Sequence, residues 1–162
     1  MSKCFKIGIL LTIFGLLVST VYAVTRDELI NKVIEAGNFI KQKNLKTAIQ
    51  KVEDLNGPYI WNNNINYLFI MDINGKMVAH PFRPDLKKPD NLLNYKDKKG
   101  KSFFIDFIEV AKSANGMGWV KYMWPLPGET EPIPKYTFVY RVPGTDYLVC
   151  SGLYVIKPGE YY

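Results

Sequence analysis

The sequence predicts an α+β fold, in which a long N-terminal helix packs on an antiparallel sheet of about five strands. Apolar residues recur at helical spacing over residues 26–55, and five later segments are short and rich in β-branched and aromatic residues. Short turn sequences join the last three of these segments, which favours antiparallel pairing. The chain has 162 residues, of which 48% are hydrophobic and 22% charged, so it is suited to one globular domain.

The first 23 residues have the layout of a secretory signal peptide. Lysines precede an apolar run over residues 7–18, and Val21 and Ala23 are the small side chains that signal peptidase reads. We expect cleavage after Ala23, which leaves a domain at residues 24–162 in the periplasm or outside the cell. Because the run is shorter than the roughly 20 residues that span a bilayer, an uncleaved N-terminal anchor is the alternative.

The first structural element of the domain is the long helix. Thr25 and Glu28 have the spacing of a capping box, in which each side chain can satisfy a backbone N–H of the first turn. The helical spacing predicts one helix to about residue 55, with a bend near Asn44. The Asn56-Gly57-Pro58 sequence ends it.

A β-hairpin is predicted next. Residues 67–73 form the first strand, and Asn74-Gly75 predicts a type I′ turn. The returning strand covers residues 76–80. It ends at Pro81, which cannot donate a hydrogen bond to a neighbouring strand.

The C-terminal half begins with a lysine- and asparagine-rich loop at residues 85–101. Ser102 then caps a second helix, which ends at Asn115-Gly116. We expect the helices to pack on one face of the sheet. Three further strands are predicted, at residues 118–125, 135–142 and 147–155.

Composition excludes several classes of protein. A single His and two Cys, one of them in the leader, argue against a disulfide scaffold or a zinc site, so we expect no metal and no cofactor. Cys150 is predicted to be a buried strand residue. Catalytic and phosphate-binding motifs are absent from the sequence, which indicates that the chain is not an enzyme. The charge of +6 is distributed over a helix face and a loop without a nucleic-acid-binding motif, so we expect no nucleic-acid partner.

Several segments, taken in their order along the chain, resemble the strands of single Cache domains of the second type. The resemblance covers about residues 26–156 and implies a PAS-like sheet outside the cytoplasmic membrane. It also implies binding of short carboxylates such as acetate, propionate or pyruvate. The segments are Tyr67–Gly75, Val78–Pro81, Trp119–Pro125, Pro134–Val139, Val142–Gly144 and Cys150–Tyr154.

Domains of this family usually lie between two membrane helices of chemoreceptors or sensor kinases. This sequence ends a few residues after its last predicted strand. We therefore expect an exported domain that binds a small organic acid and acts in signal transduction or chemotaxis through a membrane receptor or sensor kinase. The long helix also offers a surface for homodimerisation. The alternatives are a structural or protein-interaction module with a filled pocket, and a small hydrolase that uses His80 together with an acid or with Cys150.

Six residues are candidates for ligand contact. Lys135 opens a strand, and a cation buried in an apolar pocket is costly until an anionic ligand supplies the missing charge. His80 would donate to the ligand from the pocket rim, and the alternative is a structural His that ends a strand. The aromatic candidates combine apolar rings with polar tips, and the alternative for each is core packing. The predicted site residues are Tyr67, His80, Tyr122, Trp124, Lys135 and Tyr136.

Overall fold

The computed structural model describes residues 24–157 and 160–161. The predicted signal peptide lies outside the described residues, so its cleavage stays a prediction. Within the described part of the chain, none of the helices combines the length and the apolar character that crossing a membrane requires.

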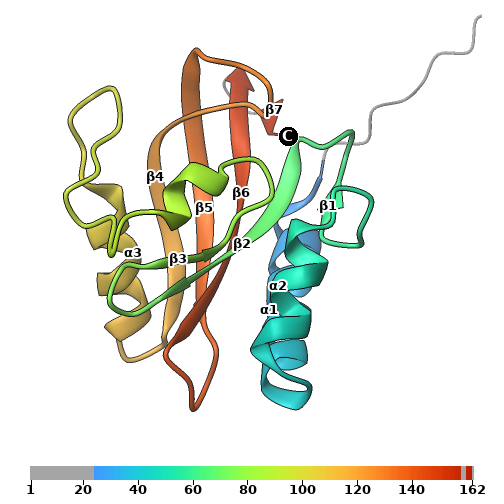
Figure 1. Cartoon of the computed structure of the whole chain (residues 1–162). Helices are drawn as coiled ribbons and strands as arrows, with labels where there is room; N and C mark the ends of the chain where they lie inside the picture. The colour runs from blue at the N-terminus through green and yellow to red at the C-terminus, as the bar shows by residue number, and fades with distance from the viewer. Residues whose placement is uncertain (1–23, 158–159, 162) are drawn as a thin grey trace, which may run out of the picture.

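The α+β prediction is confirmed (Figure 1). The strands form an antiparallel sheet in the order β1-β2-β6-β5-β4, with β3 paired to β2 and β7 paired to β6. All five predicted strands are present, and two strands of two residues each, β1 and β7, add to them. The elements in chain order are α1 (Arg26–Gln42), α2 (Leu45–Glu53), β1 (Ile60–Trp61), β2 (Asn66–Asp72), β3 (Met77–Ala79), the 3₁₀ helix η1 (Pro84–Lys87), α3 (Phe103–Lys112), β4 (Met117–Pro125), β5 (Pro132–Arg141), β6 (Tyr147–Lys157) and β7 (Glu160–Tyr161).

The predicted long helix is two helices. Its start is confirmed, because Thr25 Oγ1 accepts a hydrogen bond from the backbone N–H of Glu28 at 3.1 Å. The prediction of one continuous helix is wrong, since α1 ends at Gln42 and α2 begins at Leu45. Asn44 Oδ1 accepts from the backbone N–H of Thr47 at 2.8 Å, so Asn44 starts a new helix and does not merely bend the first.

The β2–β3 hairpin forms, but its turn is not type I′. That turn needs a positive φ at both central residues. Here Gly75 has a φ of 87°, whereas Asn74 does not have a positive φ. The Asp72 carboxylate accepts from the backbone N–H groups of Asn74 at 2.8 Å and Lys76 at 2.9 Å. These bonds satisfy two backbone N–H groups of the turn, so only one residue, Gly75, has to adopt a left-handed conformation.

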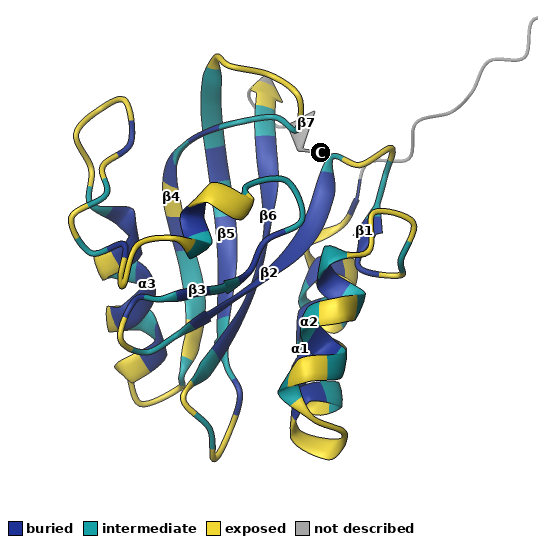
Figure 2. Cartoon of the chain, in the orientation of Figure 1, coloured by how far each residue is buried: buried dark blue, intermediate teal, exposed yellow. Residues whose placement is uncertain are grey.

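The sheet is covered on both faces, so the prediction of helices on one face is wrong. Helices α1 and α2 pack on one face and α3 packs on the other (Figure 1). Side chains alternate along β2, so Leu68 and Ile70 join the core under α1, while Tyr67 and Phe69 join the core under α3. The central strands β2 and β6 are accordingly buried along most of their length, whereas β4 and β5 are buried only in part (Figure 2). Cys150 lies fully buried in β6, as predicted.

Candidate functional site

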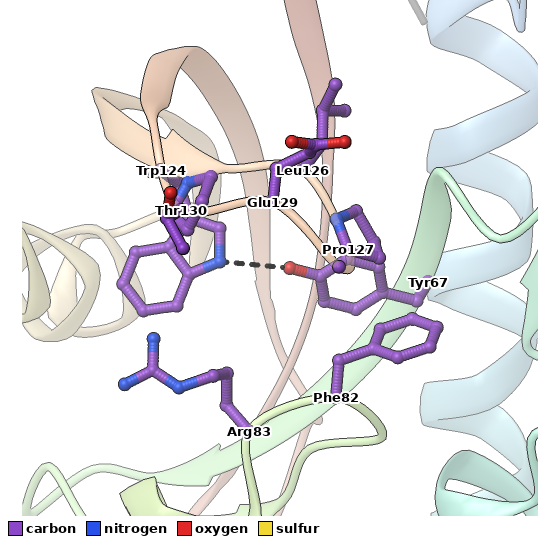
Figure 3. Close-up of a pocket in the computed structure, with 10 residues that line it drawn as sticks. Tyr67, Phe82, Arg83, Trp124, Leu126, Pro127, Glu129 and Thr130 are labelled. Atoms are coloured by element: carbon purple, nitrogen blue, oxygen red, sulfur yellow. Dashed lines mark hydrogen bonds between the residues drawn. The ribbon is translucent and has the colours of Figure 1, made fainter.

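A cavity of about 340 Å³ opens to solvent on the face of the sheet that carries α3. It lies where the start of β2 approaches the end of β4, and the turn after β4 forms part of its wall. Figure 3 shows the rings of Tyr67 and Trp124 meeting at this cavity, with Phe82 and Arg83 below them in the view. The walls are mostly apolar, and Arg83 and Glu129 are the charged residues among them.

The hydroxyl group of Tyr67 is the centre of the polar network at this wall. It accepts a hydrogen bond from Trp124 Nε1 at 3.1 Å, the dashed line in Figure 3. It also accepts one from Lys135 Nζ at 2.9 Å. The Tyr154 hydroxyl is 3.4 Å away, but its own hydrogen is donated to the carbonyl of Pro125 at 2.9 Å. The Tyr67 hydroxyl hydrogen therefore has only the long contact with Tyr154, and it is available to a ligand that accepts.

Lys135 is buried behind Tyr67. It is 1% exposed, and its amine also donates to the Tyr154 hydroxyl at 3.2 Å. The amine lies 4.1 Å from the centre of the Tyr67 ring and 4.5 Å from that of Tyr154. No carboxylate of the described residues is within ion-pair distance. Burial lowers the pKa of Lys135, and the neighbouring Tyr67 opposes this shift.

Gly152 makes room for the Lys135 side chain, and the sequence analysis did not identify it. A Cβ atom at this position would lie 2.6 Å from Lys135 Cε and 2.6 Å from Thr137 Oγ1. The lysine can therefore cross the neighbouring strand only because residue 152 lacks a side chain. A glycine inside a strand was the available signal, since such glycines often mark the close approach of another group.

His80 supports the cavity wall through the backbone of the loop after β3. It is 3% exposed, and its Nδ1 accepts from the backbone N–H groups of Phe82 at 3.2 Å and Arg83 at 3.1 Å. The neutral ring therefore carries its proton on Nε2. Burial, followed by the charges of Lys135 and Arg83, lowers the pKa of His80 to about 3. His80 thus positions two wall residues without lining the cavity.

Arg83 is a wall residue that the sequence analysis missed. Its Nε and Nη2 donate to the Asp85 carboxylate at 2.9 and 2.7 Å, and this bond raises the pKa of Arg83. Its guanidinium carbon lies 5.3 Å from the centre of the Trp124 ring. Asp85 and Trp124 together hold the guanidinium in the cavity wall. The signal in the sequence was a cation between Pro81, which ends the hairpin, and Pro84.

The structure brings five of the six predicted residues to one face of the sheet and separates the sixth. Tyr122 belongs to the packed core, because its ring stacks on Phe103 at 4.0 Å and its hydroxyl bonds with Thr137. Tyr136 follows Lys135 on β5 and therefore points to the opposite face, where the Lys121 amine lies 5.2 Å from its ring centre. Of the predicted residues, Tyr67 and Trp124 line the cavity directly.

The groups required by the hydrolase alternative are poorly suited to catalysis. Burial raises the pKa of the Cys150 thiol, so a thiolate nucleophile is disfavoured. The Nδ1 of His80 already accepts two hydrogen bonds from the backbone. Among the residues that the structure describes, there is no cluster of His, Cys, Asp or Glu that could hold a metal ion.

Comparison with known proteins gives a consistent result. A family described as "Cache domain" matches residues 19–157. The methyl-accepting chemotaxis protein McpP of Pseudomonas putida is 29% identical over 120 residues, which are 74% of this chain and 21% of that protein. The sensor histidine kinase MctS of Rhizobium johnstonii is 27% identical over 89 residues, which are 55% of this chain and 19% of that protein. The chain thus spans about a fifth of the length of these curated relatives.

Two solved structures resemble the chain over most of its length. One is the periplasmic sensor domain of a chemotaxis protein, with 28% identity, a TM-score of 0.63, and coverage of 80% of this chain and 89% of that chain. The other is a Cache chemosensory domain described as recognising carboxylic acids, with 25% identity, a TM-score of 0.67, and coverage of 80% and 92%. These relatives are sensory proteins, in agreement with the prediction that the chain is not an enzyme.

Proposed function

Because the chain belongs to the Cache domain family, we propose that it is a sensor domain that binds a small carboxylate in the cavity between Tyr67, Arg83 and Trp124. One observation carries the proposal. Trp124 Nε1 and the Lys135 amine both donate to the oxygen of the Tyr67 hydroxyl. Because that oxygen already accepts two hydrogen bonds, the hydroxyl can interact with a ligand by donating its own hydrogen. A carboxylate is the acceptor that such a site favours.

Two cations beside the cavity support an anionic ligand. Lys135 is a cation buried without a carboxylate among the described residues, and Arg83 adds a guanidinium to the wall. A ligand carboxylate would accept from the Tyr67 hydroxyl and from guanidinium N–H groups that Asp85 does not use. Lys135 would act through Tyr67, adding positive charge in a region of low dielectric constant. The rings of Phe82 and Trp124 would hold the carbon chain.

The proposed role is sensory. The domain would act outside the cytoplasm after export by its N-terminal segment, and would signal in chemotaxis or signal transduction through a membrane receptor or sensor kinase. The resemblance to McpP and MctS, and to a Cache domain described as recognising carboxylic acids, supports this role. The open cavity argues against the alternative of an interaction module with a filled pocket.

Calorimetry and thermal shift test the proposal. Acetate, propionate and pyruvate are compared with acetamide and propionamide, which have similar shapes and no charge. We expect at least one acid to bind and raise the melting temperature, and the amides to have no effect. If no acid binds, the proposal is rejected.

A matched pair of variants tests the location of the site. Tyr67→Phe removes the donor hydroxyl and is expected to weaken acid binding about tenfold, which corresponds to one hydrogen bond to a charged group. Tyr147→Phe removes a hydroxyl on the opposite face and should bind as the unchanged protein does. Equal binding by the two variants would place the ligand elsewhere.

A further inference from the structure

A second hollow, of about 430 Å³, lies beside the first cavity. Phe82 and the turn at residues 126–129 line both hollows, so the two adjoin one another. Asn63, Asn64 and Ile65 complete the second hollow. A ligand with its carboxylate at Tyr67 and Arg83 could therefore extend past Phe82 into the second hollow. The first cavity alone is within the size range of drug-sized ligands, so it has room for more than a two- or three-carbon acid.

The asparagine turn beside the second hollow has an unusual backbone. Asn62, Asn63 and Asn64 have φ values of 51°, 53° and 67°, three left-handed residues in a row. The turn is held in place because Asn62 Nδ2 donates to Asn66 Oδ1 at 2.9 Å, and Asn66 Nδ2 donates to the carbonyl of Gly152 at 3.1 Å. Such conformations persist when surrounding bonds enforce them, and they are concentrated at ligand sites.

Glu129 gives the second hollow its charge. It lines both hollows, and no ion pair or side-chain hydrogen bond engages its carboxylate within the described part of the chain. Glu131, two residues further, instead pairs with Lys98 at 3.3 Å. An unpaired carboxylate beside two amide side chains offers acceptors to a group that carries several N–H donors and a positive charge.

We propose that the second hollow is a subsite for an ammonium group, so that the domain prefers amino acids whose amine lies at the far end of the carbon chain. This inference rests on the proposed function, because the carboxylate of the same ligand occupies the first cavity. Glu129 and the amide oxygens of Asn63 and Asn64 would accept from the ammonium, and Phe82 would contact the methylene groups between the two ends.

Three acids of five carbons each test the subsite by calorimetry at low salt: 5-aminopentanoate, pentanoate and pentanedioate, which end in an ammonium, a methyl group and a carboxylate. We expect affinity to fall in that order, with 5-aminopentanoate about threefold tighter than pentanoate, the range of an exposed ion pair. Pentanedioate should bind weakest, because its second carboxylate faces Glu129.

Variants assign the preference to the second hollow. Glu129→Gln should bring the affinity ratio of 5-aminopentanoate to pentanoate close to 1, whereas Glu131→Gln removes the same charge outside both hollows and should keep the ratio. Asn63→Gly and Asn64→Gly keep a backbone that tolerates positive φ and should lower the ratio by removing an acceptor.

The outcomes separate the inference from the proposed function. If pentanoate binds and 5-aminopentanoate binds no more tightly, or if Glu129→Gln keeps the preference, the subsite is refuted and carboxylate binding stands. If acetate or propionate binds but none of the three longer acids does, the subsite is likewise refuted. If no acid of either panel binds, carboxylate binding fails together with the subsite.

Discussion

The amine of Lys135 is buried beside two tyrosine hydroxyls, with no carboxylate among the described residues to balance it. Lys135→Met is expected to stabilise the fold by about 1 kcal/mol, because an apolar side chain avoids the desolvation cost of the charge. Neither hydroxyl would be left without a partner, since Tyr67 still accepts from Trp124 and Tyr154 still donates to Pro125. Thermal unfolding without ligand measures the effect.

The same variant should weaken carboxylate binding by tenfold or more, since it removes the charge behind Tyr67. Tyr147→Phe, on the opposite face, serves as the control for both readouts. A Lys135→Met protein that is less stable than the unchanged protein, or that binds acids as tightly, would contradict this account of Lys135.

His80 makes the stability of the fold depend on pH. Its pKa is lowered from 6.5 to about 3 in the folded protein, so between these values the unfolded chain binds more protons than the folded one. The contribution is fully present above pH 6.5 and is lost as the pH falls toward 3. From pH 7 to pH 4.5, His80 should cost the fold about 2 to 3 kcal/mol.

Urea unfolding at the two pH values tests this dependence. His80→Asn keeps an oxygen that can accept from Phe82 and Arg83 but does not titrate, so it should lose less stability on acidification than the unchanged protein. An equal loss in both proteins would assign the acid sensitivity to other groups.

Some residues of the proposed site were predicted from the sequence and others were not, for a physical reason. Three of them lie on strands, where the residue type and the position along the strand indicated the face that carries the cavity. These are Tyr67, Trp124 and Lys135. Tyr136 was included despite strand alternation, which places it on the opposite face. Arg83 lies in a loop whose shape depends on the two bonds accepted by His80, and no periodic pattern predicts that shape.

At the scale of an element, β6 requires a residue without a side chain at position 152. Gly152→Ala is expected to destabilise the protein by about 2 to 3 kcal/mol, because its Cβ would overlap with Lys135 Cε and Thr137 Oγ1. Gly118→Ala is the matched control in β4, since its nearest contact is Val110 Cγ1 at 3.2 Å. Urea unfolding should give a clearly smaller loss for the control.

A double variant separates steric overlap from other effects of an added methyl group. Lys135→Ala removes one of the two overlapping side chains, so Gly152→Ala should cost less in that background than in the unchanged protein. If the cost is the same in both backgrounds, the Lys135 side chain does not depend on the space at Gly152.

The start of α1 was easier to predict than the helix break and the hairpin turn. The capping box at Thr25 and Glu28 uses a spacing visible in the sequence, and its hydrogen bond is present. The break at Asn44 and the turn at Gly75 depend on which side chains bond to the local backbone, namely Asn44 to Thr47 and Asp72 to the turn. Helical periodicity and a dipeptide signal contain no information on these bonds.

At the scale of the whole molecule, the sheet separates two hydrophobic cores, and only one of them adjoins the cavity. The face under α1 and α2 is packed, whereas the face under α3 combines a packed aromatic part with the cavity. The almost continuous burial of β2 reflects this arrangement, since a strand covered on both sides is apolar at every position. That pattern, at Tyr67 to Met71, was the signal that helices would cover both faces.

A crystal structure of the protein with bound propionate tests the central claim most directly. The account predicts the carboxylate in the 340 Å³ cavity, with one oxygen at hydrogen-bond distance from the Tyr67 hydroxyl and the guanidinium of Arg83 at hydrogen-bond distance from the same carboxylate. Lys135 would remain behind Tyr67, bonded to its hydroxyl. Propionate bound elsewhere, or a cavity in which the ligand contacts neither Tyr67 nor Arg83, would contradict the account.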